Sequence, residues 1–204
     1  MAFEKNVFVN CPFDPQYLPL LRSLLFTIIY LRLKPRIALE AMDAGQARLD
    51  KIVGLIADSK FGIHDLSRVE AANAGELFRL NMPFELGINF GCRLYGRGPQ
   101  KGKRFLILEA EPHRYRAALS DLSVSDIESH VNEPYRVVGI VRNGLKNVHP
   151  MHAAGPAKIT GAFSDFMAQN YDDLMAKGFS PTDIEALPVP ELIECMEQWV
   201  AMNL

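Results

Sequence analysis

The sequence predicts an α/β fold in which helices cover both faces of a doubly wound parallel sheet. Short β-branched and aromatic runs alternate with helical patterns from the N-terminus to about residue 110. The last of these runs, residues 104–109, has the apolar centre Phe-Leu-Ile-Leu, which is typical of a strand buried on both faces. Polar residues follow the predicted strands directly, at the sheet edge where parallel sheets bind ligands.

The first half of the chain has a β-α-β-α-β-α-β order, which implies right-handed crossovers in a sheet of four or five strands. The predicted strands are residues 7–9, 36–40, 59–63 and 104–109. The predicted helices are residues 16–33, 46–58 and 82–95.

The second half has a helical pattern, and no fifth strand is recognisable in it. Helices are predicted over residues 135–145, 157–177 and 190–202. The chain has 204 residues and 49% hydrophobic content, which is enough for one main domain with an appendage. We therefore expect an α/β core over residues 1–110 and a C-terminal helical extension over residues 111–204, packed on the core.

The composition argues against several classes of partner. Lys and Arg number 22 and Asp and Glu number 24, so the net charge of −2 gives no basic field for duplex nucleic acid. The longest apolar stretch, residues 18–33, contains Arg22 and Arg32 and is too polar to span a bilayer. The three cysteines show no C-x-x-C spacing and no grouping with histidines. We expect a cytoplasmic protein with no membrane partner and no metal.

Several sequence motifs of enzymes are absent. The chain has no G-x-x-x-x-G-K-[ST] loop and no G-x-G-x-x-G after the first strand, so ATP hydrolysis and dinucleotide redox chemistry lose their main support. It also has no G-x-S-x-G and no H-E-x-x-H motif. We therefore expect no bound cofactor, and carboxylate chemistry remains as the catalytic possibility.

Glu85 is the first candidate for such chemistry. If Asn81 caps the predicted helix, Pro83 lies in its first turn and Glu85 lies one turn inside. The positive end of the helix dipole then keeps the carboxylate ionised, as a nucleophile or a holder of sugar hydroxyls requires. The alternative is that Glu85 only favours the start of the helix, as most acidic residues in that position do.

Asp65, which follows the third predicted strand, is the second catalytic candidate. It could accept hydrogen bonds from ribose hydroxyls, or hold a proton for a departing base if its pKa is raised. It could equally be a turn residue that bonds its own backbone. His64 beside it could bind substrate, although a lone histidine next to an apolar strand is more often a structural group.

The remaining candidates would bind the substrate. Arg48, Lys51 and Arg79 could contact phosphates, or could belong to solvated helix faces. Polar residues near the predicted strand ends or the start of the helix that carries Glu85 could line the same crevice, and these are Asn10, Cys11, Asp43 and Asn81. Cys11 could also be a packing residue, as most free cysteines are.

Several segments carry a resemblance to a known superfamily, and these are Val7-Phe8-Val9-Asn10, Arg48-Leu49-Asp50-Lys51-Ile52 through Ile56-Ala57-Asp58-Ser59, Phe61-Gly62-Ile63-His64-Asp65-Leu66-Ser67 and Phe84-Glu85-Leu86-Gly87. In this order and spacing they resemble the TIR-like and nucleoside 2-deoxyribosyltransferase-like superfamily. The resemblance implies a flavodoxin-like sheet, a glutamate at position 85 that acts on an N-glycosidic bond, and an aspartate at position 65 that assists it. It also implies a homo-oligomer, because neighbouring subunits often complete active sites in both branches.

These observations lead us to expect a hydrolase-like protein that cleaves the N-glycosidic bond of NAD or a related nucleotide, in a bacterial defence or signalling setting. Nicotinamide leaves NAD as a neutral molecule, so one ionised carboxylate is sufficient. A neutral nucleoside base needs a proton donor, and hence two carboxyl groups in different protonation states. The alternatives are a nucleoside or nucleotide deoxyribosyltransferase or hydrolase, and a non-catalytic nucleotide-sensing or scaffold module.

Overall fold

The computed structural model describes residues 2–40, 47–69, 79–112, 114, 127–145 and 154–204. Its centre is a five-stranded sheet in the order β2-β1-β3-β4-β5, in which all neighbouring strands are parallel. The strands are β1 (Asn6–Asn10), β2 (Lys34–Ile37), β3 (Phe61–Asp65), β4 (Arg104–Glu109) and β5 (Ile127–Ser129). The predicted α/β fold, with its flavodoxin-like parallel sheet, is confirmed.

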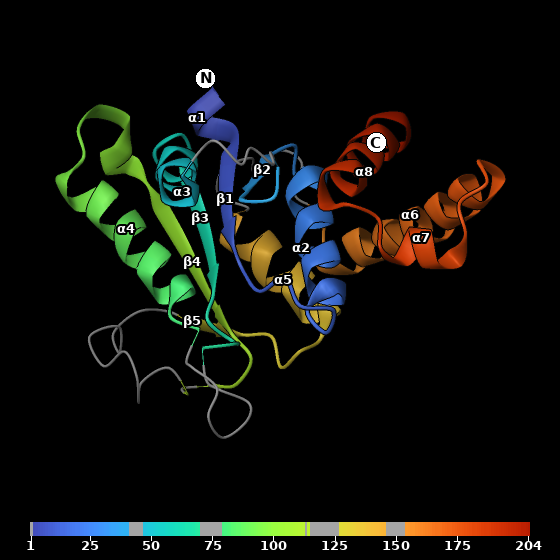
Figure 1. Ribbon diagram of the computed structural model, residues 1–204, viewed down its shortest axis with the longest axis horizontal. Coiled ribbons are helices and arrows are strands. Elements are labelled where there is room, and N and C mark those ends of the chain that lie inside the picture. The colour runs from blue at the N-terminus through green and yellow to red at the C-terminus, as the bar shows by residue number, and fades with distance from the viewer. Residues whose placement is uncertain (1, 41–46, 70–78, 113, 115–126, 146–153) are drawn as a thin grey trace.

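Helices cover both faces of this sheet (Figure 1). The helices α3 (Arg48–Ala57) and α4 (Asn81–Tyr95) pack against each other on one face. The helices α2 (Leu18–Tyr30) and α5 (Pro134–Leu145) pack against each other on the opposite face. Two short elements complete this part of the chain, and these are α1 (Ala2–Lys5) and the 3-10 helix η1 (Gly98–Gly102).

The alternation of side chains in β1 explains why both faces are covered. Phe8 packs with Ile52 and Ile56 of α3, whereas Val7 and Val9 belong to the larger core that includes α2 and α5. Successive side chains of a strand point to opposite faces of the sheet. Because β1 has apolar side chains on both faces, it requires helices on both sides, as a central strand of a parallel sheet has. All five residues of β1 are buried accordingly.

The C-terminal helices α6 (Pro156–Ala176), α7 (Pro181–Glu185) and α8 (Val189–Asn203) lie on the outer side of α2 (Figure 1). An aromatic cluster attaches them. The Phe26 ring of α2 lies 5.5 Å from the Phe166 ring of α6 and 5.8 Å from the Trp199 ring of α8, measured between ring centroids. The helical extension is therefore packed on the core through α2.

Three details of the sheet differ from the sequence-based expectation. The third strand lies at Phe61–Asp65, two residues after the predicted range 59–63, so that Asp65 is its last residue and does not follow it. The second strand lies at Lys34–Ile37, about two residues before the predicted range 36–40. A fifth strand, β5, was not predicted, because its three residues Ile-Glu-Ser carry no apolar run. The sheet thus continues past residue 110, where the sequence predicted the end of the α/β core.

Within the described ranges, no helix combines the length and the apolar character that crossing a bilayer would require.

Candidate functional site

A cavity of about 350 Å³ opens at the carboxyl end of the sheet. Its walls come from four places in the chain: the end of β1, the residue after β2, the start of α3 and the start of α4. In the strand order 2-1-3-4-5 the crossovers leave β1 and β3 toward opposite faces, which opens a crevice between the two connections. The cavity lies at this point, where parallel α/β sheets bind their ligands.

Glu85 is one of the residues that line the cavity, and only 8% of its surface is exposed. It lies in the second turn of α4, because the helix begins one residue earlier than the predicted cap implies. Leu80 occupies the N-cap position, without a side-chain bond to the helix, and Asn81 is the first helical residue. The expected cap at Asn81 was therefore wrong, and Asn81 instead lines the cavity as an exposed side chain.

Burial raises the pKa of Glu85 from 4.5 to about 7, although the positive charge of Arg48 acts in the opposite direction. The loss of hydration thus outweighs the favourable charge, which the sequence argument for a permanently ionised carboxylate did not include. A carboxyl group with this pKa can hold or release a proton at neutral pH. Groups of this kind are typical of catalytic sites.

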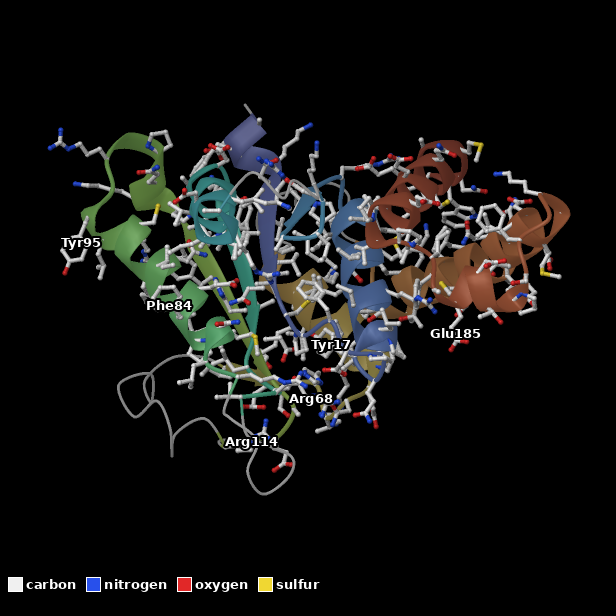
Figure 2. All side chains as sticks on the ribbon, in the orientation of Figure 1. Tyr17, Arg68, Phe84, Tyr95, Arg114 and Glu185 are labelled. Carbon is white, nitrogen blue, oxygen red and sulfur yellow. The ribbon has the colours of Figure 1, made fainter. Side chains whose placement is uncertain are left out.

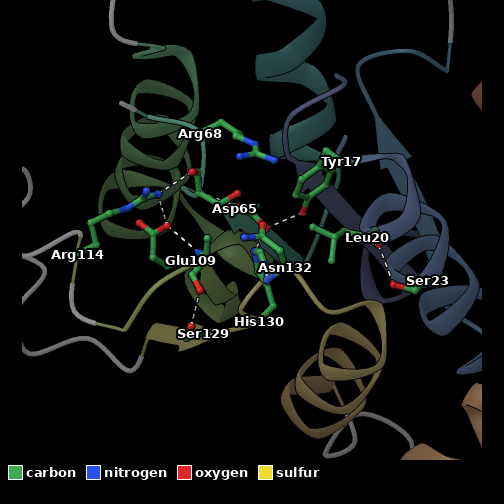
Figure 3. A network of polar contacts seen from close by, with 12 residues as sticks. Tyr17, Leu20, Ser23, Asp65, Arg68, Glu109, Arg114, Ser129, His130 and Asn132 are labelled. Carbon is green, nitrogen blue, oxygen red and sulfur yellow. Dashed lines mark hydrogen bonds and ion pairs between the residues drawn. The ribbon is translucent and has the colours of Figure 1, made fainter. Parts of the chain in front are cut away.

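Asp65, by contrast, is completely buried and is not one of the residues that line the cavity. Tyr17 donates its hydroxyl to Asp65 Oδ2 at 2.6 Å, and the backbone N–H of Ser67 donates to Oδ1 at 2.8 Å. His130 Nε2 lies 3.0 Å from Oδ2. Figure 3 shows Asp65 enclosed by Tyr17 and His130.

These contacts decide the protonation state of Asp65. Burial acts to raise its pKa, but the contacts with His130, Ser67 and Tyr17 outweigh burial, and the pKa lies below the ordinary value of 3.8. Asp65 is an ionised group at the end of β3 that contacts the residue before α2 and the residue after β5. The Ser67 bond is the aspartate turn that the sequence offered as the alternative to a catalytic role.

His64 is also completely buried, and it lies between two asparagine side chains. Its Nδ1 atom is 3.0 Å from Asn10 Nδ2, and its Nε2 atom is 2.9 Å from Asn89 Nδ2. Burial, with a smaller effect from the positive charge of Lys103, lowers its pKa to about 3. The ring is therefore neutral at physiological pH and has no direct access to the cavity.

The cavity wall carries two arginines. Arg48 lies exposed at the start of α3, and Arg79 lies just before α4 with its Nη1 atom 3.2 Å from Asp14 Oδ2. Figure 2 shows Tyr17, Arg68 and Arg114 gathered at the same end of the sheet. Lys51 is not among the lining residues, and its ammonium group donates to the carbonyl oxygen of Ala38. The phosphate-binding potential of the wall thus rests on Arg48 and Arg79.

Cys11 lines the cavity but is a poor nucleophile. Burial raises the pKa of its thiol well above the ordinary value, and the charges of Asp65, Glu85 and Asp14 add to this effect. The reactive form of a cysteine is the thiolate, which these surroundings suppress. Asp43, the remaining candidate, lies outside the described residues.

Three residues at this end of the sheet were missed by the sequence argument, namely Tyr17, Asn89 and His130. His130 follows β5 and is fixed by its own turn, because its Nδ1 atom accepts the backbone N–H of Asn132 at 2.9 Å. Val131 and Asn132 have φ angles of 45° and 59°, in the left-handed region that a β-branched residue rarely adopts. No sequence pattern indicated His130, because none indicated the strand β5 that precedes it.

Glu109 and Arg114 form a further ion pair at this edge, with an N–O distance of 2.6 Å (Figure 3). In the part of the chain that the structure describes, no group of three or more His, Cys, Asp or Glu side chains could hold a metal ion.

Comparisons with protein-family models, with curated proteins and with solved structures give no match to this chain.

Proposed function

We propose that this protein cleaves the N-glycosidic bond of NAD or a related nucleotide. The observation that carries the proposal is a nearly buried carboxyl group, that of Glu85, which has a pKa of about 7 and lines a cavity at the carboxyl end of a parallel sheet. Two arginines line the same cavity. This combination suits a ligand with a reacting sugar at one end and phosphates at the other.

The number of carboxyl groups favours NAD over a neutral nucleoside. Among the described lining residues, Glu85 is the only one with a carboxyl group. Asp65 does not reach the cavity, because it is completely buried in contact with Tyr17 and His130. One carboxylate suffices when the leaving group already carries positive charge. The pyridinium ring of bound NAD would also lower the pKa of Glu85 and so favour its ionised form.

In the proposed reaction, ionised Glu85 stabilises the positive charge that develops on the ribose, or attacks the anomeric carbon directly. The bond between that carbon and the pyridinium nitrogen breaks, and its electron pair leaves with nicotinamide, which becomes neutral. Water adds to the anomeric carbon and releases one proton. Arg48 and Arg79 hold the phosphates, and Arg79 exchanges its contact with Asp14 for a phosphate oxygen.

Incubation of the purified protein with NAD tests this proposal. We expect release of nicotinamide, and we expect Glu85→Gln to lower kcat by at least about 100-fold, because one group that stabilises transition-state charge is commonly worth that much. Glu111→Gln is the matched control, since Glu111 is an exposed glutamate just after β4 that does not line the cavity. Equal rates for the wild type and Glu85→Gln would reject the catalytic role.

A specific observation supports a second candidate, nucleoside or nucleotide hydrolysis or deoxyribosyl transfer. A carboxyl group with a pKa of about 7 is partly protonated at neutral pH and could donate a proton to a departing neutral base. The pH profile separates the two candidates. A value of kcat/KM, which reports the free enzyme, that rises as the pH passes through 7 indicates an ionised Glu85, whereas a value that falls over this range indicates a proton donor. Base exchange with a second added base would identify transfer.

Binding without turnover would point to the sensing module instead. In that case NAD would raise the melting temperature and remain intact, and Glu85→Gln would not change the response. Assembly into a homo-oligomer remains a prediction from the resemblance, and light scattering measures it directly.

A further inference from the structure

Three buried side chains form a chain of contacts behind the cavity. Asn10 at the end of β1 contacts His64 of β3, and His64 contacts Asn89 of α4. The amide nitrogen of Asn10 also donates to the carbonyl oxygen of Met82 in the first turn of α4, at 2.9 Å. His64 and Asn89 are completely buried, and Asn10 is 4% exposed.

The direction of these hydrogen bonds follows from the chemistry of the groups. A carbonyl oxygen can only accept, so the Met82 contact fixes the Asn10 amide with its NH₂ group turned inward. The second hydrogen of that NH₂ group meets His64 Nδ1, which must therefore accept. Because the ring is neutral, its single proton lies on Nε2.

The Nε2 proton needs an acceptor, and the side-chain amide of Asn89 is the group that faces it. The amide oxygen of Asn89 is fully buried and has no other partner among the described residues. A rotation of the Asn89 amide by 180° exchanges its nitrogen and oxygen, so that the oxygen faces Nε2 and accepts the ring proton. The donor and the acceptor of each contact between Asn10, His64 and Asn89 are then assigned.

In this arrangement the amide oxygen of Asn10 remains available to accept a hydrogen bond from a ligand. Asn10 lines the cavity, and both hydrogens of its amide are used by Met82 and His64. Within the described residues its oxygen has no hydrogen-bond partner, and it is not among the fully buried unpartnered atoms. It therefore faces the cavity as an acceptor that cannot rotate into a donor.

We propose that Asn10 Oδ1 accepts a hydrogen bond from a hydroxyl group of the ligand sugar, and that His64 and Asn89 are positioning residues that keep it an acceptor. The identity of the ligand as a sugar rests on the proposed function. Asn10 is bonded to the first turn of α4, one turn before Glu85, so the sugar hydroxyl and the reacting carboxyl group are held in a fixed relation. A ligand without this hydroxyl leaves the buried acceptor unpaired.

Calorimetric titration of the Glu85→Gln variant tests the assignment without turnover. The probes are NAD and its two analogues that lack the 2′- or the 3′-hydroxyl of the nicotinamide ribose. We expect at least one analogue to bind about tenfold more weakly than NAD, as the loss of a hydrogen bond to a buried group predicts. Adding Asn10→Leu should reduce this difference to within about twofold.

Asn6→Leu in the same background is the matched control. Asn6 lies at the other end of β1, is 3% exposed and also donates its amide to a backbone carbonyl, that of Asp58. Both substitutions remove a buried amide bond from one strand, but only Asn10→Leu removes a cavity-facing acceptor. Discrimination that survives Asn10→Leu, or that is lost equally in Asn6→Leu, would overturn the assignment.

Long-range ¹⁵N–¹H NMR of the imidazole rings tests the positioning role on the unaltered protein. We expect the His64 proton on Nε2 from pH 5 to pH 8, and we expect Asn89→Leu to move it toward Nδ1 and to weaken the discrimination. A wild-type ring protonated on Nδ1 would reject the scheme. If NAD binds with discrimination but is not cleaved, only the glycosidic proposal fails, and if no probe binds, both fail.

Discussion

The carboxyl group of Glu85 makes the stability of the folded protein depend on pH. Its pKa is about 7 in the folded state and near 4.5 in the unfolded chain, so the folded state binds more protons between these values. The contribution of Glu85 to stability is fully present where both states are protonated, below pH 4.5, and is lost as the pH rises through 7. The penalty at pH 8 is about 2 kcal/mol after allowance for water that reaches the cavity.

Glu85→Gln resembles the protonated side chain and should remove this penalty. We expect the variant to be about 2 kcal/mol more stable than the wild type at pH 8 and nearly equal to it at pH 5. Urea unfolding at the two pH values measures the difference. A variant that is equally stable at both, or less stable at pH 8, would mean that the folded carboxyl group titrates near its ordinary pKa.

Single residues also show where the sequence argument reached its limit. The positions of Asn10, Cys11 and Glu85 around one crevice followed from strand ends and a helix start, which local patterns reveal. The burial of Asp65 depends on Tyr17 and His130, which approach from other parts of the chain. The raised pKa of Glu85 depends on its burial in the folded protein. No local pattern contains that information.

Helix α3 depends on a residue from another part of the chain for its C-terminal end. The buried Lys103, which precedes β4, donates its ammonium group to the carbonyl oxygens of Ile56 and Ser59. These acceptors lie in the last turn of the helix and just beyond it, where carbonyl groups lack helical partners and favour a positive charge.

Lys103→Met should therefore lower the free energy of unfolding by about 2–3 kcal/mol, because the substitution leaves these carbonyl groups without their charged donor. Chemical denaturation measures the loss. Lys101→Met, at an exposed position of η1, serves for comparison and should change stability by less than about 0.5 kcal/mol. Equal effects of the two substitutions would contradict the capping role of Lys103.

The elements that the sequence predicted well are those with long periodic patterns. α4 and β4 lie within one residue of their predicted ranges, because each has an uninterrupted pattern between clear breaks. β5 and the short α7 were missed, since three and five residues are too few to establish a period. β5 exists because its backbone pairs with β4, a non-local contact.

At the scale of the whole molecule, the C-terminal helices and the α/β core share the aromatic cluster around Phe26. Trp199 is 8% exposed, contacts Phe26 and Phe166, and donates its indole N–H to Gln169 at 2.9 Å. Removal of a buried aromatic side chain leaves a cavity that the surroundings fill only in part.

We expect Trp199→Ala to lower the free energy of unfolding by about 3 kcal/mol, and we expect the proposed NAD binding to persist at low temperature because no residue that lines the cavity belongs to α2, α6 or α8. Thermal and chemical melts provide the measurement. Met202→Ala, at a position 75% exposed on the same helix, should have almost no effect. A helical extension that melts separately, with the core unaffected, would argue against a shared cluster.

The outer strands of the sheet have a consequence for how copies of the protein behave in concentrated solution. β2 has four residues and begins with the exposed Lys34, while β5 has three residues with the exposed Glu128 at its centre. At each edge of the sheet, a strand from another molecule could pair with only three or four residues, at least one of which is charged. Growth of the native fold into intermolecular β-aggregates is therefore disfavoured from both sides.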